Sequence, residues 1–259
     1  MILERAIGLL LAMMLGGLAP LLAARSAQAV DEIQVYNSEI NDPGQWSLQI
    51  HGNYVPQGRT EPDFPGGIVP DKALQGTPEL ALGVTDWWEL GAYWPYALTR
   101  DGTALLSGPK LRSLFVAPHA KQRQVLLGVN FELSYATDEF ADTPWGLEVR
   151  PIMGWRTAPW EVILNPIVDF ALSGSDRRGE FEPALRVGYT VAPLWQVALE
   201  HYADLGPVDS AYASSQQAQT TYAVVDYNGE PVEVDFGVGH GWTRASDDTT
   251  IKFILGFAL

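Results

Sequence analysis

The sequence predicts an all-β protein, a transmembrane antiparallel up-and-down β-barrel of about 12 strands. Three observations lead to this fold class. Apolar and polar residues alternate along most of the chain, the alternating segments are long enough for tilted strands to cross a bilayer, and Trp and Tyr gather toward the segment ends. After the N-terminal region, no apolar run approaches the roughly 18 to 20 residues that a membrane helix needs.

Composition narrows the possible functions. Of 259 residues, 47% are hydrophobic, 31 are acidic, 16 are basic and none is cysteine. This profile excludes a disordered or collagen-like chain, a disulfide scaffold and a cysteine-anchored lipoprotein. The net charge of -15 repels polyphosphate, so we expect no nucleic-acid partner.

Residues 1–29 have the pattern of a secretory signal peptide. An apolar run from Ile7 to Leu22 follows Arg5, and a small-residue Ala-x-Ala site ends at Ala29. Glycine and proline interrupt the run, which favours a cleaved signal over an uncleaved anchor helix. The sequence therefore predicts two parts, the signal peptide at 1–29 and an outer-membrane β-barrel domain at 30–259.

The alternating segments set the expected strand count. Between Trp46 and Tyr54, apolar side chains take one parity and polar ones such as Gln49 and His51 take the other, as in a strand with one apolar face. Twelve such segments lie near residues 45–55, 77–85, 87–98, 106–117, 123–137, 146–157, 160–173, 181–192, 195–204, 219–227, 231–242 and 250–259. An even count suits a closed barrel, although residues 106–117 alternate poorly, which leaves ten or fourteen strands possible.

Parity also predicts the effect of charge. Leu164 falls on the lipid-facing parity, so Leu164→Arg is expected to be costly, whereas Asn165→Arg on the lumenal parity should cost much less.

Connections between the segments alternate in length. Those at 85–86 and 158–159 are short, whereas those at 57–76 and 206–219 are long. This pattern predicts tight periplasmic turns at one end and external loops at the other. The alternative for the first long connection, at 57–76, is that it folds partly into the pore.

Aromatic residues are expected to form interfacial belts, because their rings are apolar at one end and polar at the other. The alternative is that they form the core of a soluble barrel. The residues assigned to the belts are Trp87, Trp88, Tyr93, Trp94, Tyr96, Trp145, Trp155, Trp160, Tyr189, Trp195, Tyr202 and Trp242.

The C-terminus carries a candidate assembly signal. Phe253, Leu255, Phe257 and Leu259 place apolar or aromatic groups at every second position up to the chain end. This pattern resembles the C-terminal strand that the outer-membrane barrel assembly machinery reads. We therefore expect that machinery and outer-membrane lipids as partners, and the outer membrane as the location.

Several segments resemble one family, the outer-membrane transporters named for the meta-pathway of phenol degradation. The resemblance covers most of the chain after the signal peptide and implies a membrane barrel that passes small solutes, such as aromatic or hydrophobic compounds. The segments that carry it are 31–36 (Asp-Glu-Ile-Gln-Val-Tyr), 51–54 (His-Gly-Asn-Tyr), 77–80 (Thr-Pro-Glu-Leu), 83–91, 108–112 (Gly-Pro-Lys-Leu-Arg) and 200–206 (Glu-His-Tyr-Ala-Asp-Leu-Gly).

Charged residues of the lumenal parity are the candidate site. Fourteen are expected to line the lumen: Glu79, Glu89, Lys110, Arg112, Glu132, Glu148, Arg150, Arg156, Glu161, Asp169, Glu182, Arg186, Glu200 and Asp235. They either line a water-filled path or pair as a polar plug. Nine are acidic and five are basic, so an open path would favour cations or neutral solutes. The arginines at 150 and 186 are expected to pair with the carboxylates at 148, 161 and 182.

No catalytic or metal motif stands out, so we expect no enzyme, no metal and no cofactor. His51, His119, His201 and His240 lack the spacing of metal ligands, and His51 is expected to belong to a lumenal hydrogen-bond network. His240 either lies at the headgroup level beside Trp242 or serves as the base of a lipid hydrolase. The expected function is a porin-like channel for passive or selective passage of small solutes. The alternatives are a non-conducting structural or surface-interaction barrel and, less favoured, an outer-membrane lipid hydrolase.

Overall fold

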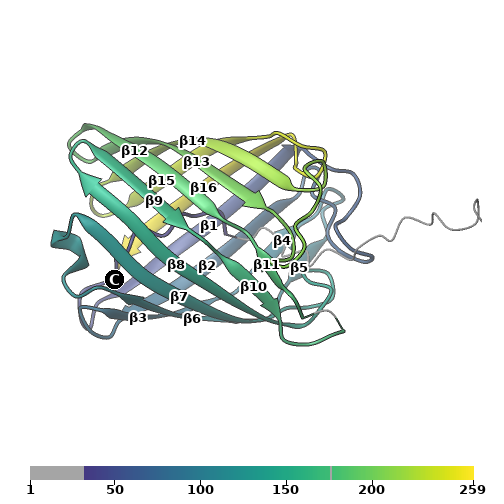
Figure 1. Cartoon of the computed structure of the whole chain (residues 1–259), viewed down its shortest axis with the longest axis horizontal. Coiled ribbons are helices and arrows are strands. Elements are labelled where there is room, and N and C mark those ends of the chain that lie inside the picture. The colour runs from purple at the N-terminus through teal and green to yellow at the C-terminus, as the bar shows by residue number, and fades with distance from the viewer. Residues whose placement is uncertain (1–31, 176) are drawn as a thin grey trace, which may run out of the picture.

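The computed structural model describes residues 32–175 and 177–259, so the predicted signal peptide lies outside the described residues. One antiparallel sheet closes on itself, because β1 pairs with β16 on one side and with β2 on the other (Figure 1). The strands are β1 (Trp46–Gln57), β2 (Leu74–Gly83), β3 (Trp88–Tyr93), β4 (Tyr96–Leu98), β5 (Ala104–Leu106), β6 (Lys110–Val116), β7 (Val125–Tyr135), β8 (Trp145–Thr157), β9 (Trp160–Asn165), β10 (Val168–Ala171), β11 (Gly179–Phe181), β12 (Ala184–Ala192), β13 (Trp195–Asp204), β14 (Ala218–Asn228), β15 (Glu233–Gly241) and β16 (Thr249–Ala258). A single 3₁₀ turn, η1 (Ala120–Gln122), is the only helical element among the described residues, and no helix there is long and apolar enough to cross a membrane.

The sixteen elements make a barrel of twelve strands, which confirms the predicted fold class. Four of the twelve are broken into two pieces, namely β3/β4, β5/β6, β9/β10 and β11/β12. A proline stands at each break: Pro95, Pro109, Pro166 and Pro183. Proline has no N–H to donate to the ladder and fixes its own φ angle, so each one interrupts the pairing without ending the strand.

The break at Pro109 explains why residues 106–117 alternate poorly. Leu106 is exposed on the outer face, whereas Leu114 and Val116, at the same parity, are buried inside. The inward and outward faces therefore exchange parity between β5 and β6. The inward side chains at the end of β6, Leu114 and Val116, are also apolar, so the polar half of the expected alternation is missing there.

The two ends of the barrel differ, as the connection lengths predict. The turn end carries the short connections, such as those at 158–159 and 193–194. The start of β1 and the end of β16 also lie there, since the N–H of Leu259 donates to the carbonyl of Trp46. The loop end carries the long connections, including 58–73 and 205–217. Figure 1 shows the strands tilted across the long axis, with the C-terminus at the turn end.

Apolar side chains cover the outer face, and aromatic residues form a belt near each end. Trp88 stacks parallel to Phe115 near the turn end, with ring centroids 6.1 Å apart, and Tyr135 packs on Trp145 near the loop end at 5.1 Å. The assignment to the belts is wrong for two residues, because Tyr93 is buried inside the barrel and Tyr202 lines its interior. Tyr93 shares its inward parity with Glu89, and Tyr202 shares it with Glu200, so each ring follows its strand's polar face.

Leu164→Arg tests the outer face. The Leu164 side chain is 38% exposed at the middle of the β9/β10 strand, and we expect the arginine to lower the free energy of unfolding by about 2–4 kcal/mol. The matched control is Val191→Arg, also on the outer face but next to the turn end, where the cost should be about 0–1 kcal/mol. Equal shifts in reversible unfolding in lipid would contradict the membrane-spanning assignment.

The expectation that Asn165→Arg is well tolerated does not hold. Asn165 is fully buried rather than bathed by water. Its side-chain amide accepts a hydrogen bond from the Tyr36 N–H at 2.7 Å and donates one to the Tyr36 carbonyl at 3.1 Å. The lumenal parity is correct, but another part of the chain occupies the space that an arginine would need.

Candidate functional site: the barrel lumen

An N-terminal segment, residues 32–45, runs through the lumen before the chain enters β1. It has no regular secondary structure, and Ile33, Val35, Tyr36, Ser38 and Ile40 are all buried. The sequence reasoning used this stretch only for the family resemblance and did not place it inside the barrel. The clue lay in the apolar residues of its first positions, which stand ahead of the first strand.

One side of the segment packs on an apolar wall of the lumen. Val35, Tyr36 and Ile40 form one buried cluster with inward side chains of β6 to β9. The contributing wall residues are Leu114, Val116, Leu126, Ile152 and Ile163. Without the segment, these apolar side chains would face water inside the lumen. The segment buries them and so completes the packing on this side of the interior.

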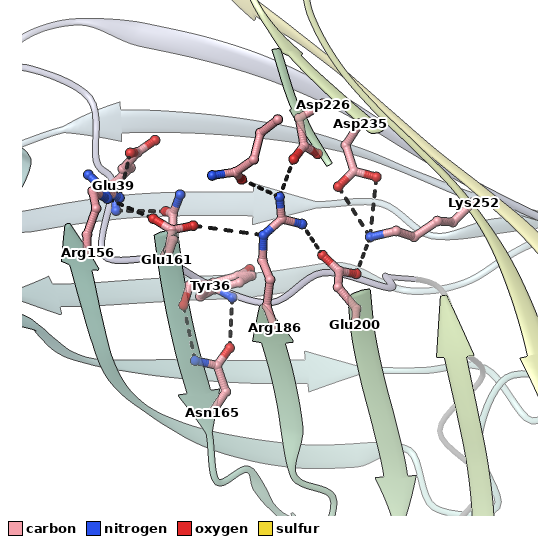
Figure 2. A network of polar contacts seen from close by, with 12 residues as sticks. Tyr36, Glu39, Arg156, Glu161, Asn165, Arg186, Glu200, Asp226, Asp235 and Lys252 are labelled. Atoms are coloured by element: carbon pink, nitrogen blue, oxygen red, sulfur yellow. Dashed lines mark hydrogen bonds and ion pairs between the residues drawn. The ribbon is translucent and has the colours of Figure 1, made fainter. Parts of the chain in front are cut away.

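Tyr36 anchors the segment on its polar side. Its backbone pairs with the Asn165 amide, and its hydroxyl lies 2.8 Å from the Tyr93 hydroxyl and 3.2 Å from Glu132 Oε1. The Arg150 guanidinium lies over the Tyr36 ring, 4.4 Å from its centroid. Figure 2 shows Tyr36 against Asn165, beside the charged network of the neighbouring strands.

Two backbone carbonyls of the segment accept hydrogen bonds from barrel cations. Arg150 Nη1 donates to the Gln34 carbonyl at 3.0 Å, and Lys252 Nζ donates to the Ile33 carbonyl at 3.2 Å. Both cations are also ion-paired to carboxylates of the barrel wall. The segment is therefore fastened by groups that the wall itself holds in place.

Arg112 joins three strands in the first charged cluster. Its Nη2 bonds Glu79 of β2 and lies 2.7 Å from Glu89 Oε1 of β3. Glu89 Oε2 in turn accepts the N–H of Asn41 at 2.6 Å, and His51 Nε2 lies 3.4 Å from Glu79 Oε2. His51 thus belongs to an internal network, as the sequence predicts.

Arg186 and Lys252 form the second cluster, on β12 to β16 (Figure 2). Arg186 pairs with both Glu200 and Asp226, and Lys252 Nζ lies 2.6 Å from Glu200 and 3.3 Å from Asp235. Lys252 is fully buried. Two cations therefore share three carboxylates, so removal of either cation leaves one cation for all three.

All fourteen predicted lumenal residues lie on the inward face of the barrel. Ten are buried, and Lys110, Arg156, Glu182 and Asp235 are half-buried. Their role in lining a path for solutes stays a prediction.

The expected ion pairs form only in part. Arg150 pairs with Glu148 at 2.7 Å, but Arg186 lies 3.9 Å from Glu161 and closer to carboxylates of the next strands. Glu182 pairs with neither arginine, because it lies on the loop-end side of Pro183 among other carboxylates. The expectation for Glu182 was wrong.

Two charged residues of the site were missed. Lys252 has the polar parity of the last strand, and Asp226 has that of β14, so alternation alone contained the signal for both. Their partners could not be read from the sequence, because β12, β13, β14 and β16 meet around one point only in the closed barrel.

The N-terminal segment divides the interior into two spaces, and Gln34 lines both. A vestibule of about 1250 Å³ reaches the turn end, and a cavity of about 230 Å³ lies toward the loop end. The vestibule wall includes Glu79, Arg112, Arg186 and Glu200 of the two clusters. The segment therefore lies between the two spaces.

Residues 58–73 form a lid over the loop-end cavity, so this connection stays at the loop end and lines the cavity there. Phe64 is buried against the cavity, and the Ile68 N–H donates to the Glu139 carbonyl at 3.2 Å. Burial lowers the pKa of the Arg59 guanidinium, but the hydrogen bond and charge of Asp63 and the charge of Asp247 raise it overall. These contacts fix the lid to itself and to the β15–β16 connection.

Polar residues also occur on the outer face near the loop end, where the sequence left a hydrolase open. His240 packs edge-on against Trp242 at 4.8 Å, and its Nδ1 lies 3.1 Å from the Asp248 carbonyl. Trp242 Nε1 donates to the Thr221 hydroxyl at 2.8 Å. This places His240 beside the aromatic belt, with a backbone carbonyl as its partner. Among the described residues, no group of three or more His, Asp or Glu is arranged to hold a metal ion.

Comparison with solved structures finds the same architecture. An outer-membrane channel from Pseudomonas putida F1 matches with a TM-score of 0.62 at 12% identity, covering 88% of this chain and 100% of that one. The chain has the fold of an outer-membrane β-barrel. The KdgM porin in complex with disordered oligogalacturonate matches with a TM-score of 0.54 at 11% identity, covering 82% and 99% of the two chains. The NanC porin matches with a TM-score of 0.53 at 12% identity, covering 82% and 100%. No protein-family model matches the sequence, and no curated protein does.

Proposed function

We propose that the protein is an outer-membrane channel for small solutes, in which the N-terminal segment narrows the lumen. The observation that carries this proposal is the pair of spaces inside a closed barrel, about 1250 Å³ and about 230 Å³, separated by residues 32–45. A barrel with a purely structural role needs no space of this size inside. Solved channels and porins of the same fold support the proposal at the level of architecture.

We propose further that the channel prefers cations and neutral solutes. Ten carboxylate side chains and five basic ones line the vestibule. One solved neighbour, the KdgM porin, was captured with oligogalacturonate. An acidic oligosaccharide would be repelled by the acidic lumen of this chain, so the shared fold does not extend to a shared solute.

Planar-bilayer recordings test both proposals. We expect discrete conductance steps from the purified protein and, in a KCl gradient, a reversal potential of the sign given by cation selectivity. Selectivity should weaken at high ionic strength, because salt screens the lumenal carboxylates. Steps with anion selectivity would contradict the charge argument alone, whereas the absence of any steps would contradict the channel.

A non-conducting barrel is the second candidate. It is favoured by the extent to which the segment and the two ion-pair clusters fill the middle of the lumen, where Lys252 and Asn165 are fully buried. In that case the segment is a permanent plug, and a pore opened by deleting it would have no counterpart in the native protein. Fractionation with the outer membrane and heat-modifiable migration are expected for both candidates.

A further inference from the structure

The cavity at the loop end differs from the vestibule in being roofed and partly aromatic. Phe64 of the lid and Phe140 of the β7–β8 connection cover it, and Tyr202 and Tyr222 face it from the barrel wall. Its volume of about 230 Å³ is below the range of about 300–1,000 Å³ usual for drug-sized ligands, so it suits a compact solute.

The lining of this cavity carries a large excess of acidic over basic side chains. Eight carboxylate side chains and three basic ones line it among the described residues. Each basic residue already has a carboxylate: Arg59 pairs with Asp63 and Asp247, Arg150 with Glu148, and Lys110 lies 3.8 Å from Glu32. The excess is therefore not neutralised by the barrel's own cations.

Glu182 lies among other carboxylates. The strongest charge effects on it come from Asp169, Asp204, Glu148 and Glu180, which are all acidic. A carboxylate in such surroundings is stabilised by any cation that enters the cavity. Glu139, at the edge of the lid, also makes no side-chain ion pair within the described part of the chain.

An amide oxygen provides independent support for a ligand. Gln75 on β2 lines the same cavity and is 8% exposed, yet its Oε1 has no hydrogen-bond partner in the described structure. A buried acceptor without a donor is costly, and a ligand with N–H groups would satisfy it. Carboxylates, an orphan acceptor and aromatic faces together match the chemistry of an ammonium group on a small apolar body.

We propose that the loop-end cavity binds small organic cations, with its excess carboxylates, Glu182 among them, attracting the ammonium group and the aromatic side chains covering the apolar body. This inference rests on the proposed channel function and names the class of solute that such a channel would take up. Because the proposal concerns binding alone, it can be tested without a membrane potential and without measuring flux.

Calorimetry on the purified protein in detergent, with three probes of one shape, tests the proposal. Benzylammonium, benzyl alcohol and benzoate share a ring and differ in charge. We expect benzylammonium to bind at least about tenfold more tightly than benzyl alcohol, which corresponds to about 1.4 kcal/mol, and benzoate not to bind. Equal affinities, tighter binding of benzoate, or no binding of benzylammonium would overturn the proposal whatever the bilayer recordings show.

Matched variants locate the site. Glu182→Gln should abolish the preference for benzylammonium over benzyl alcohol, whereas Glu61→Gln, the same change at an exposed lid position outside the cavity, should leave it intact. If Glu182→Gln does not fold, Glu139→Gln at the cavity edge takes its place, with exposed Asp138→Asn as its neighbouring control. A preference that survives loss of the cavity carboxylate would reject this cavity as the site.

Discussion

Deleting residues 32–41 should raise the single-channel conductance several-fold. The segment occupies the lumen between the vestibule and the loop-end cavity, and its removal joins the two spaces. It also removes the segment that packs on the inward apolar residues of β6 to β9. We therefore expect a larger pore together with lower stability, measured by bilayer recording and by the unfolding midpoint.

A point substitution separates the segment's role from the cost of the deletion. Asn165→Ala removes the two hydrogen bonds to the Tyr36 backbone and should increase the frequency of large-conductance openings. Asn130→Ala is the control, because Asn130 is also a fully buried, inward asparagine but donates to Glu132 instead. Identical recordings from the deletion and the intact protein would show that residues 32–45 do not limit passage.

Lys252→Met should lower the free energy of unfolding by about 3–5 kcal/mol, because Arg186 is then left to compensate the three carboxylates of the buried cluster. Lys252 is fully buried and is the partner of both Glu200 and Asp235. Methionine keeps much of the side-chain volume, so the loss of charge dominates the effect. Reversible unfolding in detergent or lipid measures it.

Two further variants check that the effect comes from the buried charge. Lys121→Met removes a similar pair with Asp42, but Lys121 is half exposed, so we expect a change of about 0–1 kcal/mol. Adding Glu200→Gln to Lys252→Met should recover part of the loss, because Arg186 then has one carboxylate fewer to compensate. A small effect of Lys252→Met, equal to that of Lys121→Met, would mean that water reaches the cluster and screens it.

The barrel could be predicted from the sequence because alternation is a local signal. Alternation along one strand distinguishes its two faces. The outward direction of Leu164 and the inward direction of Glu161 can therefore be predicted without knowledge of the neighbouring strands. The prediction weakened where a proline changed the parity, as at Pro109, and where the inward face was apolar, as at Leu114.

Most of the candidate site could not be predicted in this way. The alternation identified Arg186 and Glu200 as inward residues, but their pairing depends on strand registers that only the closed sheet fixes. The path of residues 32–45 depends on contacts such as Lys252 with Ile33, which are more than 200 residues apart in sequence. A segment without periodicity gives no signal of its own, and its place follows from the shape of the space left inside the barrel.

The seam between β1 and β16 bears on how the protein is made. It joins Ser47 to Ala258, so the first strand lacks one of its two neighbours until the last strand has been synthesised. Until then β1 has an open edge, which is able to capture a strand from another chain. Lys252 on β16 also holds Ile33 of the segment that precedes β1, so the strand that closes the sheet also anchors the segment inside it. A chain without its last strand would lose the closed sheet and this anchor, whereas Asn165 and Arg150, which also hold the segment, lie on other strands.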